Sequence, residues 1–422
     1  MNHLKVIIIL LISSIFIFAC SSTKHISSRK PPFKFEGITL SKKIDIKDTV
    51  AVPQELTTTF SIEDREVIAH LKLQNLSGKH TLRWNWYDPA GYLYYTTGDF
   101  PIIISPGKYL RETTAWHRLS IQDNKASDYP GHWQVRVFLD GELMEYTSFI
   151  LKPLTDISQL PENSQKRNHK NWGLIIGIEN YAHLPSVDYA RKDAMIVKEY
   201  FTKILGVPEE NILSLIDDEA TKARIEEYFK DYIPYYVDED TILYVYYVGH
   251  GAPEKEKGEL YLFPYDSDTR FITKTAYRLK NFYQNLDNLK VNKVFVYLDS
   301  CFNGVAARGS EMLAKGTRPA LVYIDDITLH SDDVVSMIAS SSGQTSHSYP
   351  ETNHGLFTYF LLKGLMGEAD SDYDHWISVP EIFNYVKTHV TRVSRKMGIE
   401  QTPVIIPSVD MLKDIAVSRV SN

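Results

Sequence analysis

The chain has 422 residues, 43% of them hydrophobic, which leaves room for two or three globular domains. Its formal net charge is -7 and no long block of one sign interrupts it, so nucleic acid is not an expected partner. With two cysteines, a fold built on a disulfide framework is excluded.

The N-terminal segment has the features of a secretory signal. Lys5 supplies a positive charge, residues 6–18 form an apolar core, and Ile17-Phe-Ala-Cys20 resembles the cleavage box of bacterial lipoproteins. A core of about 13 residues is too short to cross a bilayer. We expect residues 1–19 to be removed and Cys20 to be lipidated. This would anchor the protein to membrane in the bacterial cell envelope, outside the cytoplasm, with the outer membrane favoured over the inner. An uncleaved anchor or an ordinary signal peptide is the alternative.

The next two segments differ in their apolar pattern. Residues 20–52 are expected to form a tether, since the first part is polar and rich in Ser and Lys. In residues 53–152, apolar side chains alternate with polar ones in short runs, and turn signals such as Asp88-Pro-Ala-Gly91 separate these runs. Period-two alternation with frequent turns predicts an all-β, immunoglobulin-like sandwich. Its alternating tryptophans are expected in the core.

Residues 153–170 are polar, contain two prolines and are expected to be a linker. Apolar runs then alternate with amphipathic stretches through residues 171–422. The predicted strands are 173–178, 211–216, 242–248, 294–298 and 334–340, and the predicted helices between them are 189–205, 221–233 and 277–289. Two more helices are expected near the C-terminus. This order predicts an α/β domain with a mostly parallel sheet flanked by helices.

Two of the predicted strands are followed by residues with acid–base or nucleophilic chemistry. His250 lies in Tyr-Val-Gly-His-Gly, after the strand at 242–248, and Cys301 lies in Leu-Asp-Ser-Cys-Phe-Asn-Gly, after the strand at 294–298. One predicted helix separates these strands, so we expect them to be neighbours that end at the ligand-binding edge of the sheet. The histidine precedes the cysteine by about 50 residues, a separation typical of a caspase-like pair. We interpret the pair as a cysteine peptidase site.

The chemistry explains these residue types. A thiolate is strongly nucleophilic, and an imidazole that titrates near pH ~6.5 can take up the thiol proton and protonate the leaving amine. Gly251 lets a substrate backbone approach, and its N–H, with that of Cys301, is expected to form an oxyanion hole. Each motif alone also occurs in structural roles, whereas the pair in this order favours catalysis. We expect neither a cofactor nor a metal in this site.

The region from about 171 to 410 resembles the caspase-like cysteine peptidases, in particular metacaspase-type and bacterial members. The matching segments are, in order, Gly173-Leu-Ile-Ile-Gly-Ile178, Arg191-Lys-Asp-Ala194, Gly249-His-Gly251, Asp299-Ser-Cys301, Ser336-Met-Ile-Ala-Ser-Ser-Ser342 and Gly355-Leu-Phe-Thr358. The resemblance implies a catalytic dyad of His250 and Cys301. The residues flanking Cys301 differ from those of animal caspases, and residues 184–188 lack the arginine with which caspases receive aspartate.

Substrate preference is predicted from two carboxylates. Asp299 lies two residues before Cys301, and Asp193 lies in the first turns of the helix that follows the first strand. Two acids near the nucleophile favour Lys or Arg at the cleaved position, and the resemblance implies the same. The alternatives are structural: a helix N-terminal charge for Asp193 and a strand-end cap for Asp299.

An acidic segment near the C-terminus has the spacing of an EF-hand calcium loop. Asp370, Asp372, Asp374 and Glu381 occupy its positions 1, 3, 5 and 12. His375 stands at position six, where the sharp turn favours glycine. We therefore interpret the segment as an acidic connection between helices, with calcium binding as the alternative.

Together these features predict a lipid-anchored cysteine endopeptidase that cleaves protein or peptide substrates after Lys or Arg. The expected segments are a signal peptide (1–19), a tether (20–52), a β-sandwich (53–152), a linker (153–170) and a caspase-like catalytic domain (171–422). A catalytically silent caspase-like scaffold that binds a protein partner is the main alternative, and another hydrolase with the same dyad is the second.

Overall fold

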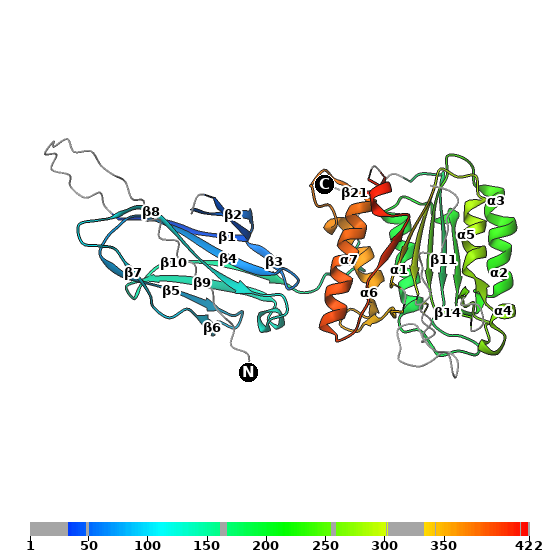
Figure 1. Ribbon diagram of the computed structural model, residues 1–422, viewed down its shortest axis with the longest axis horizontal. Coiled ribbons are helices and arrows are strands. Elements are labelled where there is room, and N and C mark those ends of the chain that lie inside the picture. Colours follow the sequence, from blue (N-terminus) through cyan, green and yellow to red (C-terminus); the bar gives the residue numbers. More distant parts are fainter. Residues whose placement is uncertain are drawn as a thin grey trace. The chain divides into compact units, whose positions relative to one another are not determined.

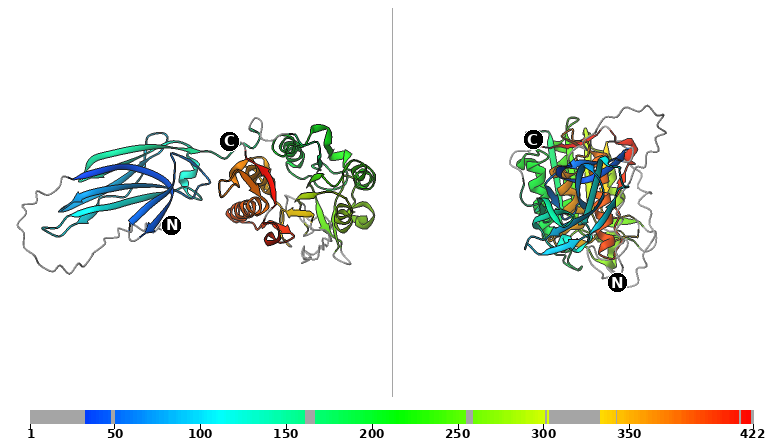
Figure 2. Two further views of the ribbon diagram at one scale, coloured as in Figure 1. Left: turned by 90° about the horizontal axis from the view of Figure 1, so that it is seen from above. Right: turned by 90° about the vertical axis from the view of Figure 1, so that its left-hand side faces the viewer.

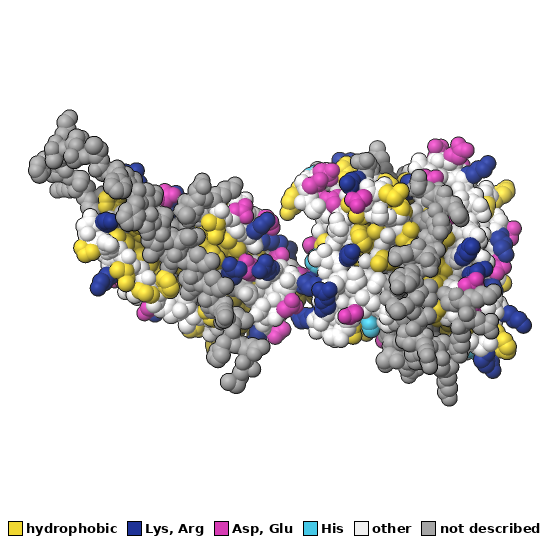
Figure 3. Space-filling view, viewed as in Figure 1, with side chains coloured by type: hydrophobic (Ala, Val, Ile, Leu, Met, Phe, Trp, Pro, Cys, Tyr) yellow, Lys and Arg dark blue, Asp and Glu magenta, His cyan; other side chains and the backbone are white. Residues whose placement is uncertain are grey.

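The structure is a computed structural model that describes residues 33–47, 50–160, 167–254, 259–300, 302, 333–341, 343–413 and 415–420. The chain divides into two compact units, residues 1–155 and 156–422, which are described separately. On the face drawn in Figure 3, acidic and basic side chains of the described residues are interspersed. No helix in the described ranges is both long enough and apolar enough to cross a membrane.

The first unit contains two β-sheets (Figure 1). The four-stranded sheet has the order β2 (Val50–Leu56), β1 (Lys34–Lys47), β4 (Glu66–Leu76) and β8 (Leu110–Ser120). The six-stranded sheet has the order β3 (Thr59–Ser61), β10 (Glu142–Lys152), β9 (Gly131–Leu139), β5 (Lys79–Tyr87) and β6 (Leu93–Thr96), and β7 (Phe100–Ile103) also pairs with β5.

Alternating side chains of both sheets form one core, as the sequence pattern predicts. Val67, Leu71, Trp86 and Trp133 are all buried within a single hydrophobic cluster. The indole N–H of Trp86, on β5, donates to Nδ1 of His117, on β8, over 3.0 Å. This buried hydrogen bond joins the two layers, because each residue belongs to a different sheet.

The expected tether is wrong for much of its length. Residues 34–47 form β1, which lies inside the four-stranded sheet between β2 and β4. Its register shifts between Glu36 and Ile38, around Gly37, whose φ is 26°. A bulge of this kind interrupts period-two alternation at one point. Beyond it, Ile38, Leu40, Ile44 and Ile46 alternate with polar residues, which is the pattern of a strand.

The expected linker is also shorter than residues 153–170. The second unit begins at Asp156, and Ile157 is buried in it, with its carbonyl accepting a 2.9 Å hydrogen bond from the Tyr200 hydroxyl. The Asn168 N–H donates to the Gly206 carbonyl over 2.9 Å. These contacts attach both described ends of the segment to the second unit.

The second unit is built on a six-stranded sheet of order β12-β11-β13-β17-β18-β22. These strands are Ile212–Ile216, Asn171–Gly177, Ile242–Val248, Lys293–Asp299, Val334–Ile338 and Val404–Ile406. All neighbours are parallel except β22, which is antiparallel to β18. The mostly parallel sheet confirms the predicted α/β class.

Helices cover both faces of this sheet (Figures 1 and 2). One face carries α1 (Ala190–Lys203), α6 (Leu356–Lys363) and α7 (Val379–Lys396). The other carries α2 (Lys222–Glu227), α3 (Ile233–Tyr236) and α5 (Leu279–Asp287). A π-helical turn, Tyr228–Tyr232, joins α2 to α3, so this helical path continues past Pro234, where the sequence predicted its end.

Three small sheets of short strands complete the described part of the unit. β14 (Gly251–Pro253), β15 (Leu260–Leu262) and β16 (Tyr277–Arg278) form a small sheet. β19 (Ser348–Tyr349) pairs with β20 (His354–Gly355), and β21 (Trp376–Ser378) pairs with β23 (Ala416–Arg419). The first two of these groups contain residues that contact the candidate site.

We predict that His117→Gln makes the first unit less sensitive to acid. Burial lowers the pKa of His117 to about 4 from its ordinary 6.5, and Arg118 adds to this shift. Between these values the unfolded state binds more protons than the folded state, so stability falls as the pH falls. Glutamine keeps an acceptor for Trp86 and does not titrate.

The measurement is urea unfolding of the full chain, followed by tryptophan fluorescence, at pH 7 and pH 4.5. The loss of unfolding free energy between these pH values should be about 2 kcal/mol smaller in His117→Gln. His132→Gln, at an exposed histidine of the same unit, should behave like the parent protein. Equal acid sensitivity of the two variants would contradict the prediction.

Candidate functional site

The parallel register brings the two motif-bearing strands to the same edge. Val248, the last residue of β13, pairs with Asp299, the last residue of β17, and Gly177 of β11 pairs with Val248. The Gly249 N–H donates to the Asp299 carbonyl over 3.4 Å. The segments that carry His250 and Cys301 therefore leave adjacent strands at the same level. Cys301 itself, like Cys20, lies outside the described residues.

The His250 imidazole is fully buried and held by the loop between β11 and α1. Its Nε2 lies 2.7 Å from the Pro185 carbonyl oxygen. A carbonyl can only accept, so Nε2 carries the proton and Nδ1 carries the lone pair of the neutral ring. This tautomer leaves Nδ1 as the ring atom able to receive a proton.

Burial lowers the pKa of His250 to about 4, and the hydrogen bond to the Pro185 carbonyl opposes part of this shift. The imidazole is therefore neutral at neutral pH. Desolvation disfavours the charged ring, so a proton taken up by His250 is readily given to a leaving group.

The backbone around His250 distinguishes the roles of the two flanking glycines. The Phe263 N–H donates to the His250 carbonyl over 3.0 Å, and Gly251 pairs with Leu262 in the β14–β15 ladder. In an antiparallel ladder the next residue turns its N–H away from the partner strand. The Gly251 N–H therefore points away from β15, as a donor to a substrate oxygen must. Gly249 instead has no space for a side chain, because a Cβ there would lie within 3.0 Å of two tyrosine oxygens.

The loop that holds His250 is anchored at its start by Asp217, which follows β12. The Asp217 carboxylate accepts hydrogen bonds from the N–H groups of Glu179 and Asn180, with lengths of 2.8 and 3.0 Å. It also accepts a 3.1 Å hydrogen bond from the guanidinium of Arg191, on α1. These contacts tie three neighbouring segments together beside the strand ends.

Asp193, predicted to bind substrate, is fully buried on α1. Its Oδ1 lies 2.6 Å from Nδ1 of His354, and its Oδ2 accepts the Gly355 N–H over 2.9 Å. Both partners belong to β20, directly before α6. His354 carries no signal in the sequence, because no pattern links it to Asp193.

Asp299, the second predicted substrate-binding residue, is also fully buried. Its Oδ1 accepts the Ser346 hydroxyl over 2.5 Å, and its Oδ2 accepts the Thr358 hydroxyl over 2.6 Å. The Thr358 oxygen lies 2.7 Å from the Tyr246 hydroxyl on β13. The structure thus places Asp193 and Asp299 against the same short segment, residues 354–358. The segment Gly355-Leu-Phe-Thr358 was a family signal, but it carried no predicted role.

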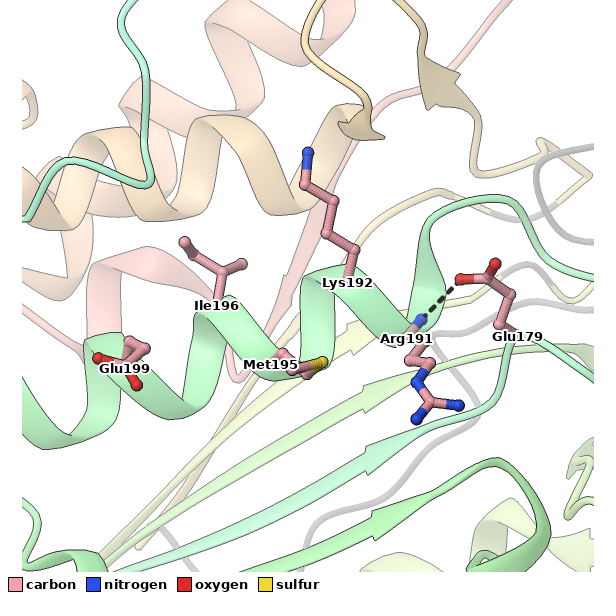
Figure 4. Close-up of a pocket in the computed structure, with 6 residues that line it drawn as sticks. All are labelled: Glu179, Arg191, Lys192, Met195, Ile196 and Glu199. Carbon is pink, nitrogen blue, oxygen red and sulfur yellow. Dashed lines mark hydrogen bonds between the residues drawn. The ribbon is translucent and has the colours of Figure 1, made fainter.

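A pocket lies along α1 and the start of the loop after β11 (Figure 4). Its lining residues are Glu179, Arg191, Lys192, Met195, Ile196 and Glu199. Glu179 accepts the backbone N–H of Arg191 over 3.1 Å, and Met195 is 60% exposed. Because His250 does not line this pocket, we locate the candidate site by the strand ends.

The acidic segment at 370–381 has its first three carboxylates close together. Oxygens of Asp370, Asp372 and Asp374 lie within 4.8 Å of one another. Glu381 instead forms a capping box with Ser378 at the start of α7, and its other oxygen accepts from Ser371. Glu381 therefore acts as a helix-capping residue.

Comparisons with known proteins relate the second unit to one family. The caspase domain matches residues 170–412, more than half of the chain. No curated protein matches the chain. Similar solved structures include a protein from Geobacter sulfurreducens, with 16% identity, a TM-score of 0.42 and coverage of 60% of this chain and 100% of that one.

Two further solved structures are similar to part of the chain. Caspase-1 from Spodoptera frugiperda shows 16% identity, a TM-score of 0.39 and coverage of 58% of this chain and 90% of that one. An immunoglobulin-like protein from Pseudomonas aeruginosa shows 16% identity, a TM-score of 0.20 and coverage of 30% and 100%.

We predict that Thr358→Val destabilises the second unit by about 2–3 kcal/mol, because it removes a hydroxyl donor from the buried Asp299 carboxylate. Thr358→Ser keeps the hydroxyl and loses a methyl group, so its cost should be about 1 kcal/mol. Urea unfolding of both variants gives the comparison. A valine variant as stable as the serine variant would show that the hydrogen bond contributes little.

Proposed function

Because the chain belongs to the caspase-domain family, we propose that it is a cysteine endopeptidase whose dyad is His250 and Cys301. The observation that carries the proposal is the neutral, carbonyl-held imidazole of His250 at the end of β13. The register between β13 and β17 supports the pairing, since Cys301 follows Asp299 by two residues.

In the proposed reaction, the Cys301 thiol gives its proton to His250 and its sulfur attacks the carbonyl carbon of the peptide bond. The imidazolium then protonates the leaving amine, and water hydrolyses the thioester to release the acid. The N–H groups of Gly251 and Cys301 would stabilise the oxyanion, each contributing about 3–4 kcal/mol. The direction of the Gly251 N–H, away from β15, supports this role.

We further propose that the enzyme prefers Lys or Arg before the scissile bond. Asp193 and Asp299 support this preference, because both carboxylates lie near the edge that carries His250 and contact residues 354–358. The absence of the caspase arginine from residues 184–188 removes the usual receptor for aspartate.

A location in the bacterial cell envelope completes the proposal. Residues 6–18 and Cys20 support a lipid-anchored protein exported from the cytoplasm. Several acyl chains, at about 0.8 kcal/mol per buried methylene, are sufficient for stable anchoring. Its substrates would then be proteins or peptides that reach this membrane surface.

We predict that Cys301→Ala and His250→Ala each lower peptide cleavage by about 10⁴-fold or more, since members of a catalytic unit act together. Ser300→Ala, beside the nucleophile, is the matched control and should stay active. Labelling with a thiol-directed peptide inhibitor should modify Cys301 in the parent protein. Cleavage by Cys301→Ala at the parent rate would show that the dyad assignment is wrong and that a different nucleophile acts. A parent protein that neither cleaves peptide nor reacts with the inhibitor would favour the scaffold alternative.

Peptides that differ only in the residue before the scissile bond test the preference. Lys and Arg peptides should exceed the Ala peptide in kcat/KM by about tenfold or more, because a charge-assisted hydrogen bond contributes about 1.5–3 kcal/mol. Asp193→Asn and Asp299→Asn should reduce this difference. Fastest turnover of the Asp peptide would refute the preference.

Lipidation is tested by mass spectrometry of the N-terminal peptide and by membrane fractionation. We expect a mature chain that starts at an acylated Cys20, and we expect Cys20→Ala to lose the acylated, membrane-bound form. An unmodified Cys20 in membrane-bound protein would point to an uncleaved anchor.

A further inference from the structure

A second contact between His250 and its supporting loop involves a side chain. The His250 N–H donates to the hydroxyl oxygen of Tyr181 over 2.7 Å. The phenol ring also lies against the imidazole, with ring centroids 4.7 Å apart and planes tilted by 35°. Tyr181 therefore contacts both the backbone and the reactive ring of the same histidine.

Gly249 makes this contact possible. A Cβ at this position would lie 2.5 Å from the Tyr181 hydroxyl oxygen and 3.0 Å from that of Tyr247. Any side chain at residue 249 would therefore displace a tyrosine that contacts His250. The glycine before the histidine is required for packing.

Tyr247 holds the other side of the His250 backbone. Its hydroxyl donates to the His250 carbonyl over 2.7 Å and accepts the Phe263 N–H over 3.2 Å. The N–H and the carbonyl of His250 are thus each bound by a different phenol. The His250 backbone, which lies between β13 and β14, cannot shift without breaking one of these bonds.

Tyr181 is itself fixed by its neighbours in the chain. Asn180 donates its N–H to Asp217, and Ala182 donates its N–H to the Tyr265 carbonyl over 3.1 Å. The same loop supplies Pro185, whose carbonyl binds Nε2 of His250. The backbone on both sides of Tyr181 is therefore held in place by hydrogen bonds.

We propose that Tyr181 is a positioning residue for His250: its hydroxyl fixes the histidine backbone, and its ring fixes the plane of the imidazole and excludes water from one face. This inference rests on the proposed peptidase function, in which the direction of Nδ1 decides whether the thiol proton can be transferred. The Pro185 carbonyl fixes one ring edge, and the Tyr181 ring opposes rotation about the Cβ–Cγ bond. Together they orient Nδ1.

Two substitutions separate the hydroxyl from the ring. Tyr181→Phe removes only the acceptor for the His250 N–H, and Tyr181→Leu also removes the aromatic face. Tyr228→Phe is the matched control, because Tyr228 packs against the same hydrophobic cluster and lies outside the loop that holds His250. Each variant of the full chain is compared by thermal unfolding, by peptide hydrolysis and by NMR titration of ¹³C-labelled histidine, with His250 assigned from His250→Gln.

Water reaching the ring favours its charged form, so Tyr181→Leu should raise the pKa of His250 by about one unit or more. Its kcat should fall about tenfold or more while KM changes by less than about twofold, as expected for a loss of positioning. Tyr181→Phe should keep the pKa near the parent value and lower kcat by a smaller factor. Tyr228→Phe should match the parent protein in both readouts.

The proposal is overturned if the folded Tyr181 variants keep the parent pKa of His250 and the parent kcat. If Tyr181→Leu does not fold, an unchanged kcat in Tyr181→Phe overturns the role of the hydroxyl. If the parent protein cleaves no peptide, the proposed function fails, and the NMR titration still decides whether Tyr181 controls the environment of His250.

Discussion

The parallel register between β13 and β17 is the constraint on which the candidate site depends. Val248 pairs with Asp299, so His250 and the segment that follows Asp299 leave the sheet at the same level. A slip of one residue would reverse the face of every side chain on the strand. Tyr247 would leave the core shared with α5, and Tyr246 would lose Thr358. The position of His250 therefore follows from the packing of helices on both faces of the sheet.

Burial of two carboxylates imposes a second constraint. Asp193 and Asp299 are fully buried, and a buried charge is tolerated when hydrogen-bond donors surround it. Gly355 supplies a donor to Asp193, and Thr358 supplies one to Asp299. The start of α6 thus joins α1 to the end of β17 through polar contacts. A change in this short segment would be transmitted to both carboxylates.

The elements of the second unit were predictable to the extent that burial leaves a pattern. A parallel strand buried on both faces is a continuous apolar run, and β13 has the bounds that this run predicts. β1 was missed although Ile38, Leu40, Ile44 and Ile46 alternate with polar residues, because the polar composition of the preceding segment was taken to extend to residue 52. The linker was overestimated because a polar composition does not reveal that Ile157 is buried.

Some residues of the candidate site were likewise predictable from the sequence, and others were not. Asp193, His250 and Asp299 were identifiable from their positions after predicted strands or at a helix start. Their partners were not. Pro185 acts through a backbone carbonyl, which has no residue-type signal. Ser346 and Thr358 are separated from Asp299 by 47 and 59 residues, and their approach depends on the path of the intervening chain.

In the Gly-His-Gly motif, the two glycines meet different requirements, one of packing and one of backbone direction. Gly249 lacks a side chain because two tyrosine oxygens occupy the adjacent space, and one of them binds the His250 N–H. Gly251 belongs to a ladder that turns its N–H away from β15. The first glycine thus leaves room for the contact that holds the histidine, and the second has the N–H direction that the proposed oxyanion donor requires. Side chains at these two positions would therefore have different effects: at residue 249 on the orientation of the imidazole, and at residue 251 on access to the proposed oxyanion donor.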